Sequence, residues 1–231
     1  MCWRKENEKI NMGKVYFVSS IDTNIGKTYA TGILAKSIAE KGKSVITQKM
    51  IQTGCINTSE DIEAHRKIQG IGELEEDRMG ITCPYIFTYP CSPHMAADRD
   101  GCTIDYGKIY SATRQLQEKY EYVLLEGAGG LMVPTDHKRL TIDYVREHHY
   151  PLLLVTNGRL GSINQTLLNI EMCKYYDIPV ASLIYNRYPH EDEAIEQNTL
   201  DYLHERYPEL SILLLPEWTG RGRMDLGNLL E

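Results

Sequence analysis

The sequence predicts an α/β protein with a doubly wound, mainly parallel β-sheet and helices on both of its faces. Continuous apolar runs such as residues 122–126 and 151–156 alternate with segments of helical periodicity. Strands without polar alternation are typical of parallel sheets that are buried on both faces. The chain has 231 residues, of which 42% are hydrophobic and 25% charged, which fits a single domain of this class.

The elements of this fold follow in order along the chain. Residues 14–19 predict the first strand, residues 27–41 a helix that Gly42 ends, and residues 44–49 the second strand. Residues 50–100 carry Gly and Pro interruptions and predict irregular structure, apart from a helix over 59–69 with Ser59 as its N-cap. The rest of the chain predicts helices over 104–119, 163–176 and 191–206, and strands over 122–126, 151–156, 180–185 and 212–216.

Composition excludes several classes of protein. The net charge of −7 counts against nucleic-acid binding, which requires a basic surface. No apolar run approaches the roughly 18 residues of a membrane span. The first residues, MCWRKENEKIN, are charged and do not resemble a signal peptide. The six cysteines show no metal-binding spacing and suit reduced thiols in a cytoplasmic protein. We expect residues 1–12 to be a flexible extension and residues 13–231 to form the domain.

In a sheet of this kind, ligands bind beyond the carboxyl ends of the strands. The residues that follow each predicted strand are therefore the candidates for a site. Several of these stretches contain the residue types that phosphate and metal chemistry uses. They are residues 22–28, 49–53, 126–130, 157–164, 186–187 and 216–218.

The first of these stretches contains a phosphate-binding motif. The segment VSSIDTNIGKT leads from a predicted strand into a predicted helix, where free backbone N–H groups and the helix dipole attract anions. Gly26 allows close approach of the backbone to phosphate, Lys27 is placed to reach the β- and γ-phosphates, and the Thr28 hydroxyl suits Mg²⁺. The spacing of this loop differs from the usual pattern, which has glycine where this chain has Ile21.

Other strand ends supply carboxylates and a second cation. Glu126 ends a buried strand and precedes Gly127, Ala128 and Gly129, a run that favours close approach of a ligand. Asp61 lies early in its predicted helix, where it suits either a metal or the helix dipole. Lys49 ends the second strand and is a candidate for neutralising charge on a transferred phosphoryl group.

The motifs VSSIDTNIGKT, KMIQTG, SED, SPH, LLEGAGGLMVP, GRLGSINQTL and LIYNR follow one another in this order. Over residues 14–189 this series resembles the dethiobiotin synthetases. The resemblance implies a homodimer of P-loop subunits that uses ATP (or another nucleoside triphosphate) and Mg²⁺. It further implies that CO₂ or bicarbonate and 7,8-diaminononanoate are converted to a cyclic urea. One amine forms a carbamate, the carbamate takes the γ-phosphoryl group, and the second amine closes the ring.

The resemblance also implies a role for individual residues. Lys49 and Lys27 would be catalytic, and Thr28, Asp61 and Glu126 would bind the metal. Substrate contacts fall on Thr23, Thr53, Leu160, Gly161, Ser162 and Asn164, the last four reaching the substrate carboxylate across the dimer. Nucleotide contacts fall on Asn24, Ile25, Gly26, Lys27, Thr28, Tyr29, Asp61, Glu126, Gly127, Ala128, Gly129, Asn186, Arg187, Pro216, Glu217 and Trp218.

The chain departs from the family pattern at several positions. Ser20 stands where the family usually has glycine, and Met50, Thr53 and Arg187 replace proline, serine and an acid. The main alternative is a P-loop switch ATPase of the partitioning or targeting type. Many of those proteins have a second lysine five residues before the lysine of the GKT motif. Here that position is Asp22, which counts against the alternative.

Overall fold

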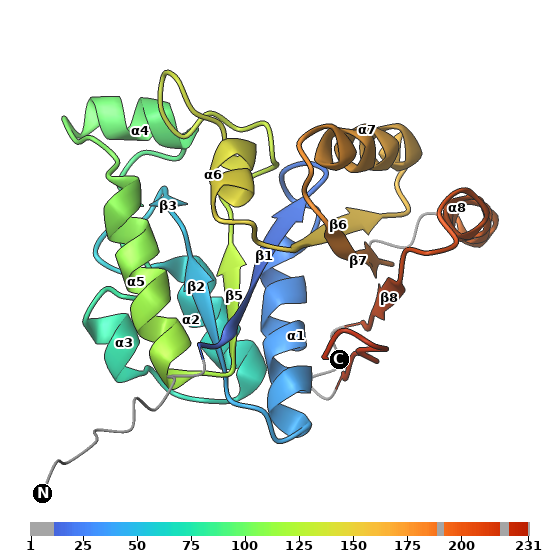
Figure 1. Cartoon of the computed structure of the whole chain (residues 1–231), viewed down its shortest axis with the longest axis horizontal. Helices are drawn as coiled ribbons and strands as arrows, with labels where there is room; N and C mark the ends of the chain where they lie inside the picture. Colours follow the sequence, from blue (N-terminus) through green and yellow to red (C-terminus); the bar gives the residue numbers. More distant parts are fainter. Residues whose placement is uncertain (1–11, 189–191, 218–221, 231) are drawn as a thin grey trace, which may run out of the picture.

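The structure, a computed structural model, describes residues 12–188, 192–217 and 222–230. Its main sheet has six parallel strands in the order β2-β5-β1-β6-β7-β8, drawn in Figure 1. This confirms the predicted doubly wound sheet. The strands are β1 (Lys14–Ser20), β2 (Val45–Lys49), β5 (Tyr122–Glu126), β6 (Leu152–Asn157), β7 (Val180–Asn186) and β8 (Ile212–Leu215).

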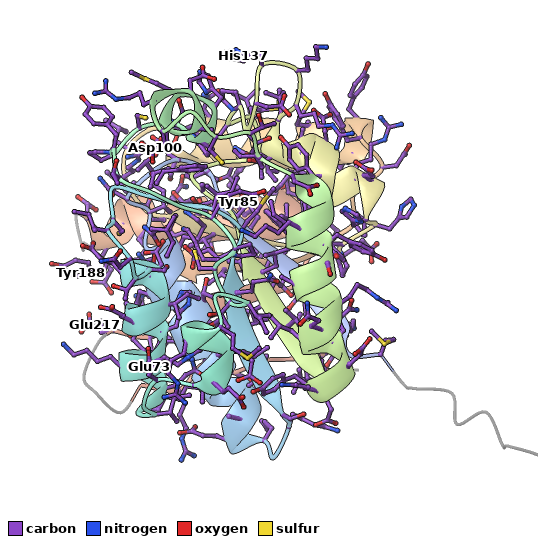
Figure 2. All side chains as sticks on the ribbon, turned by 90° about the vertical axis from the view of Figure 1, so that its left-hand side faces the viewer. Glu73, Tyr85, Asp100, His137, Tyr188 and Glu217 are labelled. Atoms are coloured by element: carbon purple, nitrogen blue, oxygen red, sulfur yellow. The ribbon has the colours of Figure 1, made fainter. Side chains whose placement is uncertain are left out.

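The predicted helices are also present and cover both faces of the sheet. In the view of Figure 2, α2 and α5 lie on opposite sides of the strands. Helix α1 packs against α2 and β2, α5 against β5, and α7 against β6. No helix of the described ranges has both the length and the apolar character to cross a membrane. The long helices are α1 (Lys27–Glu40), α2 (Glu60–Gln69), α5 (Tyr106–Lys119), α7 (Ser162–Tyr175) and α8 (Glu193–Arg206).

The prediction that residues 50–100 are irregular outside one helix was wrong. This segment also contains α3 (Glu75–Arg78) and α4 (Pro93–Arg99), and strands β3 (Gln52–Thr53) and β4 (Ile86–Phe87) pair with each other. Helix α6 (Thr141–Glu147) was not predicted either. These elements are too short to show a period in the sequence, and the β3–β4 pairing joins residues more than thirty positions apart.

The register of the sheet places the candidate residues at one edge. Strand β5 lies between β1 and β2, and Glu126 is aligned with Val18 on one side and with Lys49 on the other. The arrowheads of these strands point toward the upper part of Figure 1, where α4 and α6 lie. The apolar residues of β1 and β5 are buried throughout, so the backbone that carries Glu126 is held by the core.

Two predictions fall outside the described residues. Residues 1–11 of the expected N-terminal extension and Trp218 of the expected nucleotide site are not among them. Both expectations stay predictions.

Candidate active site

The loop between β1 and α1 has the shape of a phosphate-binding loop. Gly26 is the N-cap residue of α1 and has a φ of 94°, a left-handed conformation that favours glycine. Ser20, the substituted position, is not among the described residues with positive φ. Its buried hydroxyl donates to the carbonyl oxygen of Asp22 at 2.6 Å. Serine therefore fits at this position and stabilises the loop.

Asn186 fastens this loop to the end of β7. Its Nδ2 atom donates to the carbonyl oxygen of Ile25 at 2.8 Å, and its Oδ1 accepts from the amide of Tyr188 at 3.0 Å. A Cβ atom added at Gly26 would lie 2.4 Å from the same Nδ2 atom. The close approach of Asn186 thus supplies a second reason for glycine at position 26.

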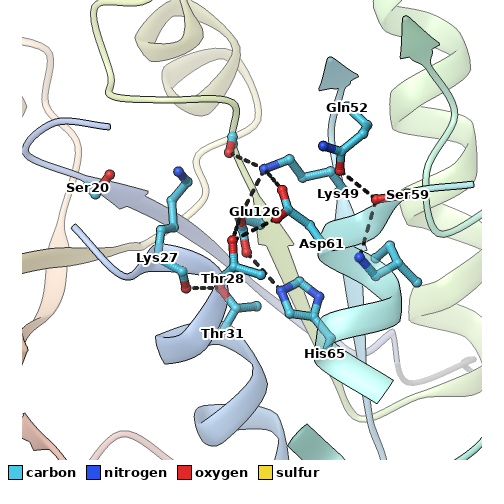
Figure 3. A network of polar contacts seen from close by, with 12 residues as sticks. Ser20, Lys27, Thr28, Thr31, Lys49, Gln52, Ser59, Asp61, His65 and Glu126 are labelled. Carbon is cyan, nitrogen blue, oxygen red and sulfur yellow. Dashed lines mark hydrogen bonds and ion pairs between the residues drawn. The ribbon is translucent and has the colours of Figure 1, made fainter. Parts of the chain in front are cut away.

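Lys49 lies at the centre of a polar cluster, shown in Figure 3. Its ammonium group is 2.5 Å from Asp61 Oδ2 and 2.9 Å from Glu126 Oε1, and it donates to the carbonyl oxygen of Gly127 at 3.2 Å. All three ammonium hydrogens therefore have acceptors. The Thr28 hydroxyl lies 2.8 Å from Asp61 Oδ1 and 3.3 Å from Glu126 Oε1, which joins the phosphate-binding loop to the cluster.

The charges of this cluster stabilise one another. Burial opposes ionisation of Glu126, but Lys49 and His65 outweigh this effect and hold the pKa of Glu126 well below its usual value. Burial likewise opposes the charge of Lys49, yet Glu126 and Asp61 raise the pKa of Lys49. Burial and the Lys49 charge lower the pKa of Lys27 to about 8. An anion bound beside Lys27 would favour its protonated form.

Oxygen atoms suited to Mg²⁺ meet beside Lys49. Thr28 supplies a hydroxyl and Asp61 and Glu126 supply carboxylates, the hard ligands that Mg²⁺ prefers. Within the described ranges no group of three or more His, Cys, Asp or Glu side chains is arranged to hold a metal. These protein oxygens therefore suit an Mg²⁺ ion that phosphate oxygens also bind. They do not suit a metal that protein groups hold alone.

A cavity of about 910 Å³ opens at this edge of the sheet. It is lined by the phosphate-binding loop, by β3, by residues 90–93 and by Lys49. Eleven of the predicted site residues line this cavity: Thr23, Asn24, Gly26, Lys27, Thr28, Tyr29, Lys49, Thr53, Asp61, Ala128 and Gly129. Glu126 and Gly127 are buried beneath it, and Ile25 is 1% exposed in the core.

A second cavity of about 590 Å³ adjoins the first, since both are lined by Gly26 and Tyr29. Of the residues predicted to lie near the base, Asn186, Pro216 and Glu217 line it, together with Tyr188 and Leu215. Figure 2 labels Tyr188 and Glu217 near one another at the surface. Arg187 does not line this cavity, because its guanidinium pairs with Glu196 on α8.

The residues predicted to bind the substrate carboxylate lie at the start of α7. Within one chain, Leu160, Gly161, Ser162 and Asn164 line neither of these two cavities. Leu160 is 84% exposed, whereas Ser162 is buried. Arg159 of the same loop binds Asp22 Oδ2 at 2.6 Å and so connects this loop to the phosphate-binding loop.

Analysis of the sequence did not identify two parts of the site. His65 is fully buried and its Nε2 atom lies 2.9 Å from Glu126 Oε2. It follows Asp61 by four positions on α2, a helical spacing that places both residues on one face. Residues 90–93 line the main cavity. The SPH motif marked this segment, but no role followed from it.

The fold and the loop define a P-loop nucleotide-binding protein. A family model described as an AAA domain matches residues 14–213. A ParA family ATPase from Chlorobium tepidum covers 90% of this chain and 85% of its own, at 17% identity and a TM-score of 0.53. The MinC:MinD cell division protein complex of Aquifex aeolicus covers 90% and 83%, at 16% identity and a TM-score of 0.55. At this identity the two structures support the fold alone.

Relatives of higher identity define the family. The chain is 55% identical to an ATP-dependent dethiobiotin synthetase of Pasteurella multocida, over 86% of this chain and 92% of the relative. It is 59% identical to one from Haemophilus influenzae, over 78% and 95%. A Chlorobaculum tepidum relative with the same function in its name is 50% identical, over 86% and 83%. The chain belongs to the family of ATP-dependent dethiobiotin synthetases.

Proposed function

We propose that the chain catalyses the ATP-dependent formation of dethiobiotin from 7,8-diaminononanoate and CO₂ or bicarbonate, with release of ADP and phosphate. The relatives support this reaction, since their names describe ATP-dependent dethiobiotin synthetases at 50 to 59% identity. Residues 13–231 act as the catalytic domain in this proposal.

One observation carries the proposal on structural grounds. The cavity of about 910 Å³ is lined not only by the phosphate-binding loop and Lys49 but also by Thr53 and residues 90–93. A triphosphate held by Lys27 and Thr28 therefore has room beside it for a second reactant. A P-loop switch ATPase needs no such space, and Asp22 stands where its second lysine would be. The relatives do not favour that alternative.

The chemistry then needs positioning and charge neutralisation rather than a strong base. One substrate amine combines with CO₂ and loses a proton to form a carbamate. A carbamate oxygen attacks the γ-phosphorus, and the bond to ADP breaks. The second amine attacks the carbonyl carbon of the resulting anhydride, loses a proton and expels phosphate. Lys27 and Lys49 neutralise the negative charge that collects between the two reactants.

Thr28, Asp61 and Glu126 would hold Mg²⁺, which when bound neutralises charge on the phosphate oxygens. The backbone N–H groups of residues 24–28 would bind the phosphates. Asn186, Pro216 and Glu217 border the place for the base, with Arg187 and Trp218 predicted nearby. Thr23 and Thr53 would contact the diamine.

The proposed enzyme is a homodimer. Leu160, Gly161, Ser162 and Asn164 line neither of the two cavities described above. They would bind the substrate carboxylate in the site of the partner subunit. Leu168 and Tyr175 on α7 are 61% and 81% exposed. An interface on this helix would cover both.

A single assay tests the reaction. Purified protein is incubated with ATP, Mg²⁺, bicarbonate and the diamine, and phosphate release and the cyclic urea are measured together. We expect phosphate release to require both the diamine and bicarbonate, and one urea to form per phosphate. Phosphate release that is the same without diamine would instead favour a switch ATPase. Repeating the assay with GTP and CTP determines the preferred base.

A further inference from the structure

Glu126 makes a contact that the proposed chemistry does not use. Its Oε1 atom faces Lys49 and Thr28, at 2.9 and 3.3 Å, while its Oε2 atom lies 2.9 Å from Nε2 of His65. Both side chains of the His65–Glu126 pair are 0% exposed. Figure 3 shows His65 reaching Glu126 from α2, below Asp61. The two oxygens of Glu126 thus have separate partners.

The hydrogen in this contact belongs to His65. Glu126 is paired with the ammonium group of Lys49 at 2.9 Å, and a carboxylate in such a pair only accepts hydrogen bonds. Nε2 of His65 is therefore the donor. Nδ1 of the same ring has no hydrogen-bond partner among the residues that the structure describes, and a buried N–H without an acceptor is costly. The geometry favours the tautomer with hydrogen on Nε2 and none on Nδ1.

A donor in this position restricts the rotation of the Glu126 carboxylate. Strand β5 holds the backbone of Glu126, but the carboxylate can still turn about its last torsion, which is broad for glutamate. The bond from His65 fixes Oε2 toward α2 and leaves Oε1 toward Lys49 and Thr28. His65 also lies on the helix that carries Asp61. One helix thus positions both carboxylates of the cluster.

We propose that His65 is a positioning residue that orients the Glu126 carboxylate toward the magnesium site by a hydrogen bond from Nε2. This inference rests on the proposed function, because it assumes that Thr28, Asp61 and Glu126 hold Mg²⁺. Such an arrangement follows the general rule that groups behind metal ligands fix the direction of those ligands. The role belongs to His65 in addition to its packing in the core.

The test compares His65→Leu, which keeps a similar volume without a donor, with His65→Gln, whose amide nitrogen can take the place of Nε2. ATP affinity is measured by calorimetry without and with Mg²⁺. We expect the gain in affinity that Mg²⁺ gives to fall at least fivefold in H65L and to stay within twofold of the wild type in H65Q, consistent with the loss of a second partner of a metal ligand. ATP binding without Mg²⁺ should be unchanged in both. An undiminished gain in H65L would overturn the inference.

Ile62→Ala is the matched control, because Ile62 is a buried residue of the same helix and has no hydrogen bond from its side chain to Glu126. It should lower the melting temperature and leave the Mg²⁺ gain intact. If Mg²⁺ increases the ATP affinity of I62A as little as that of H65L, then His65 acts only through its packing in the core. If the wild type itself shows no Mg²⁺ gain, the proposed metal site fails, and the inference fails with it.

A second readout needs no metal. The ¹⁵N shifts of the His65 ring, assigned by comparison with the H65Q spectrum, should show a protonated Nε2 and an unprotonated Nδ1. A ring protonated on Nδ1 alone would contradict the proposed donor, even if the metal site itself is correct.

Discussion

At the scale of single residues, the site depends on the buried ammonium group of Lys49, which pairs with two carboxylates. Lys49 is 5% exposed, and its ammonium group lies between two carboxylates from different elements. Removing one partner of a buried ion pair leaves a charge without compensation. Lys49 therefore contributes to stability as well as to the proposed chemistry, and its variants must be tested for both.

We expect Lys49→Met to lower kcat by about a thousandfold, since a charge that stabilises the transition state is lost. Unfolding free energy should fall by about 3 kcal/mol, because Glu126 and Asp61 are left without their cation. Steady-state kinetics and denaturant unfolding measure the two effects. Lys43→Met is the control, since Lys43 forms an exposed ion pair with Glu121. Normal turnover by K49M would disprove the role of Lys49.

Asn186 provides a second prediction at this scale. Asn186→Ala removes the bond to the Ile25 carbonyl and should weaken nucleotide binding about tenfold, or about 1.4 kcal/mol. The loss should be similar for ATP, GTP and CTP, because the bond holds the loop and not a base. Calorimetry measures it, with Asn169→Ala as a control that removes a similar amide-to-carbonyl bond on α7. A loss confined to ATP would show that Asn186 reads the base.

At the scale of elements, α2 is the helix that brings the carboxylate and the histidine to β5. Its N-terminus is capped by Ser59, whose hydroxyl accepts from the amide of Ile62 at 3.3 Å. Arg66 of this helix binds Asp77 of α3 through two nitrogens, at 2.9 and 2.7 Å. A bidentate pair of this kind is strong and directional, so it fastens α2 to α3. Nη1 of Arg66 also donates to Oγ1 of Thr47 on β2 at 2.9 Å, which holds α2 against the sheet.

The Arg66–Asp77 pair predicts how stability depends on pH. Burial would raise the pKa of Asp77, but Arg66, the amide of Leu74 and the hydroxyl of Thr82 outweigh it and lower the pKa below the ordinary value of 3.8. The pair therefore stabilises the fold above pH 3.8, and this contribution declines as the pH falls through the lowered pKa.

Asp77→Asn should reduce the unfolding free energy at pH 7 by about 3 kcal/mol. The difference from the wild type should shrink as the pH falls below 3.8. Urea unfolding at a series of pH values measures it, and Glu73→Gln, at an exposed ion pair with Arg78, is the control. A difference that does not change with pH would mean that the charge of Asp77 is not the cause.

At the scale of the whole molecule, the site of one chain is incomplete under the proposed function. The residues expected to bind the substrate carboxylate lie at the N-terminus of α7 and line neither of the two cavities described above. Leu168 and Tyr175 are seven positions apart on this helix, which places them on one face. Exposed apolar side chains on one face of a helix favour a protein interface.

We therefore expect Leu168→Asp to convert a dimer into a monomer in sedimentation experiments. Its KM for the diamine should rise at least tenfold, while ATP binding, which uses residues of one chain, should stay the same. Met79→Asp alters another exposed apolar side chain, outside α7, and should leave the dimer intact. A wild-type protein that sediments as a monomer but has full activity would disprove the shared site.

The sequence by itself determined the fold class and the P-loop, and it predicted most of the residues that line the main cavity. Continuous apolar strands predicted the parallel sheet. Lys27 and Thr28 begin α1, and Lys49 and Glu126 end β2 and β5. These features are local, so the sequence of each short segment is enough to predict them. The resemblance of the ordered motifs supplied the remaining assignments and the family.

Only the tertiary structure decided which groups touch. It placed Lys49 against Glu126 through the register of β2 and β5, paired Asp22 with Arg159 across 137 positions, and turned Arg187 toward α8. It also revealed His65 behind Glu126, 61 positions away. Such contacts depend on packing between distant segments, which no local pattern encodes. The serine at position 20 has a local explanation instead. Its φ is not positive, so glycine is not required there, and its hydroxyl bonds to the nearby carbonyl oxygen of Asp22.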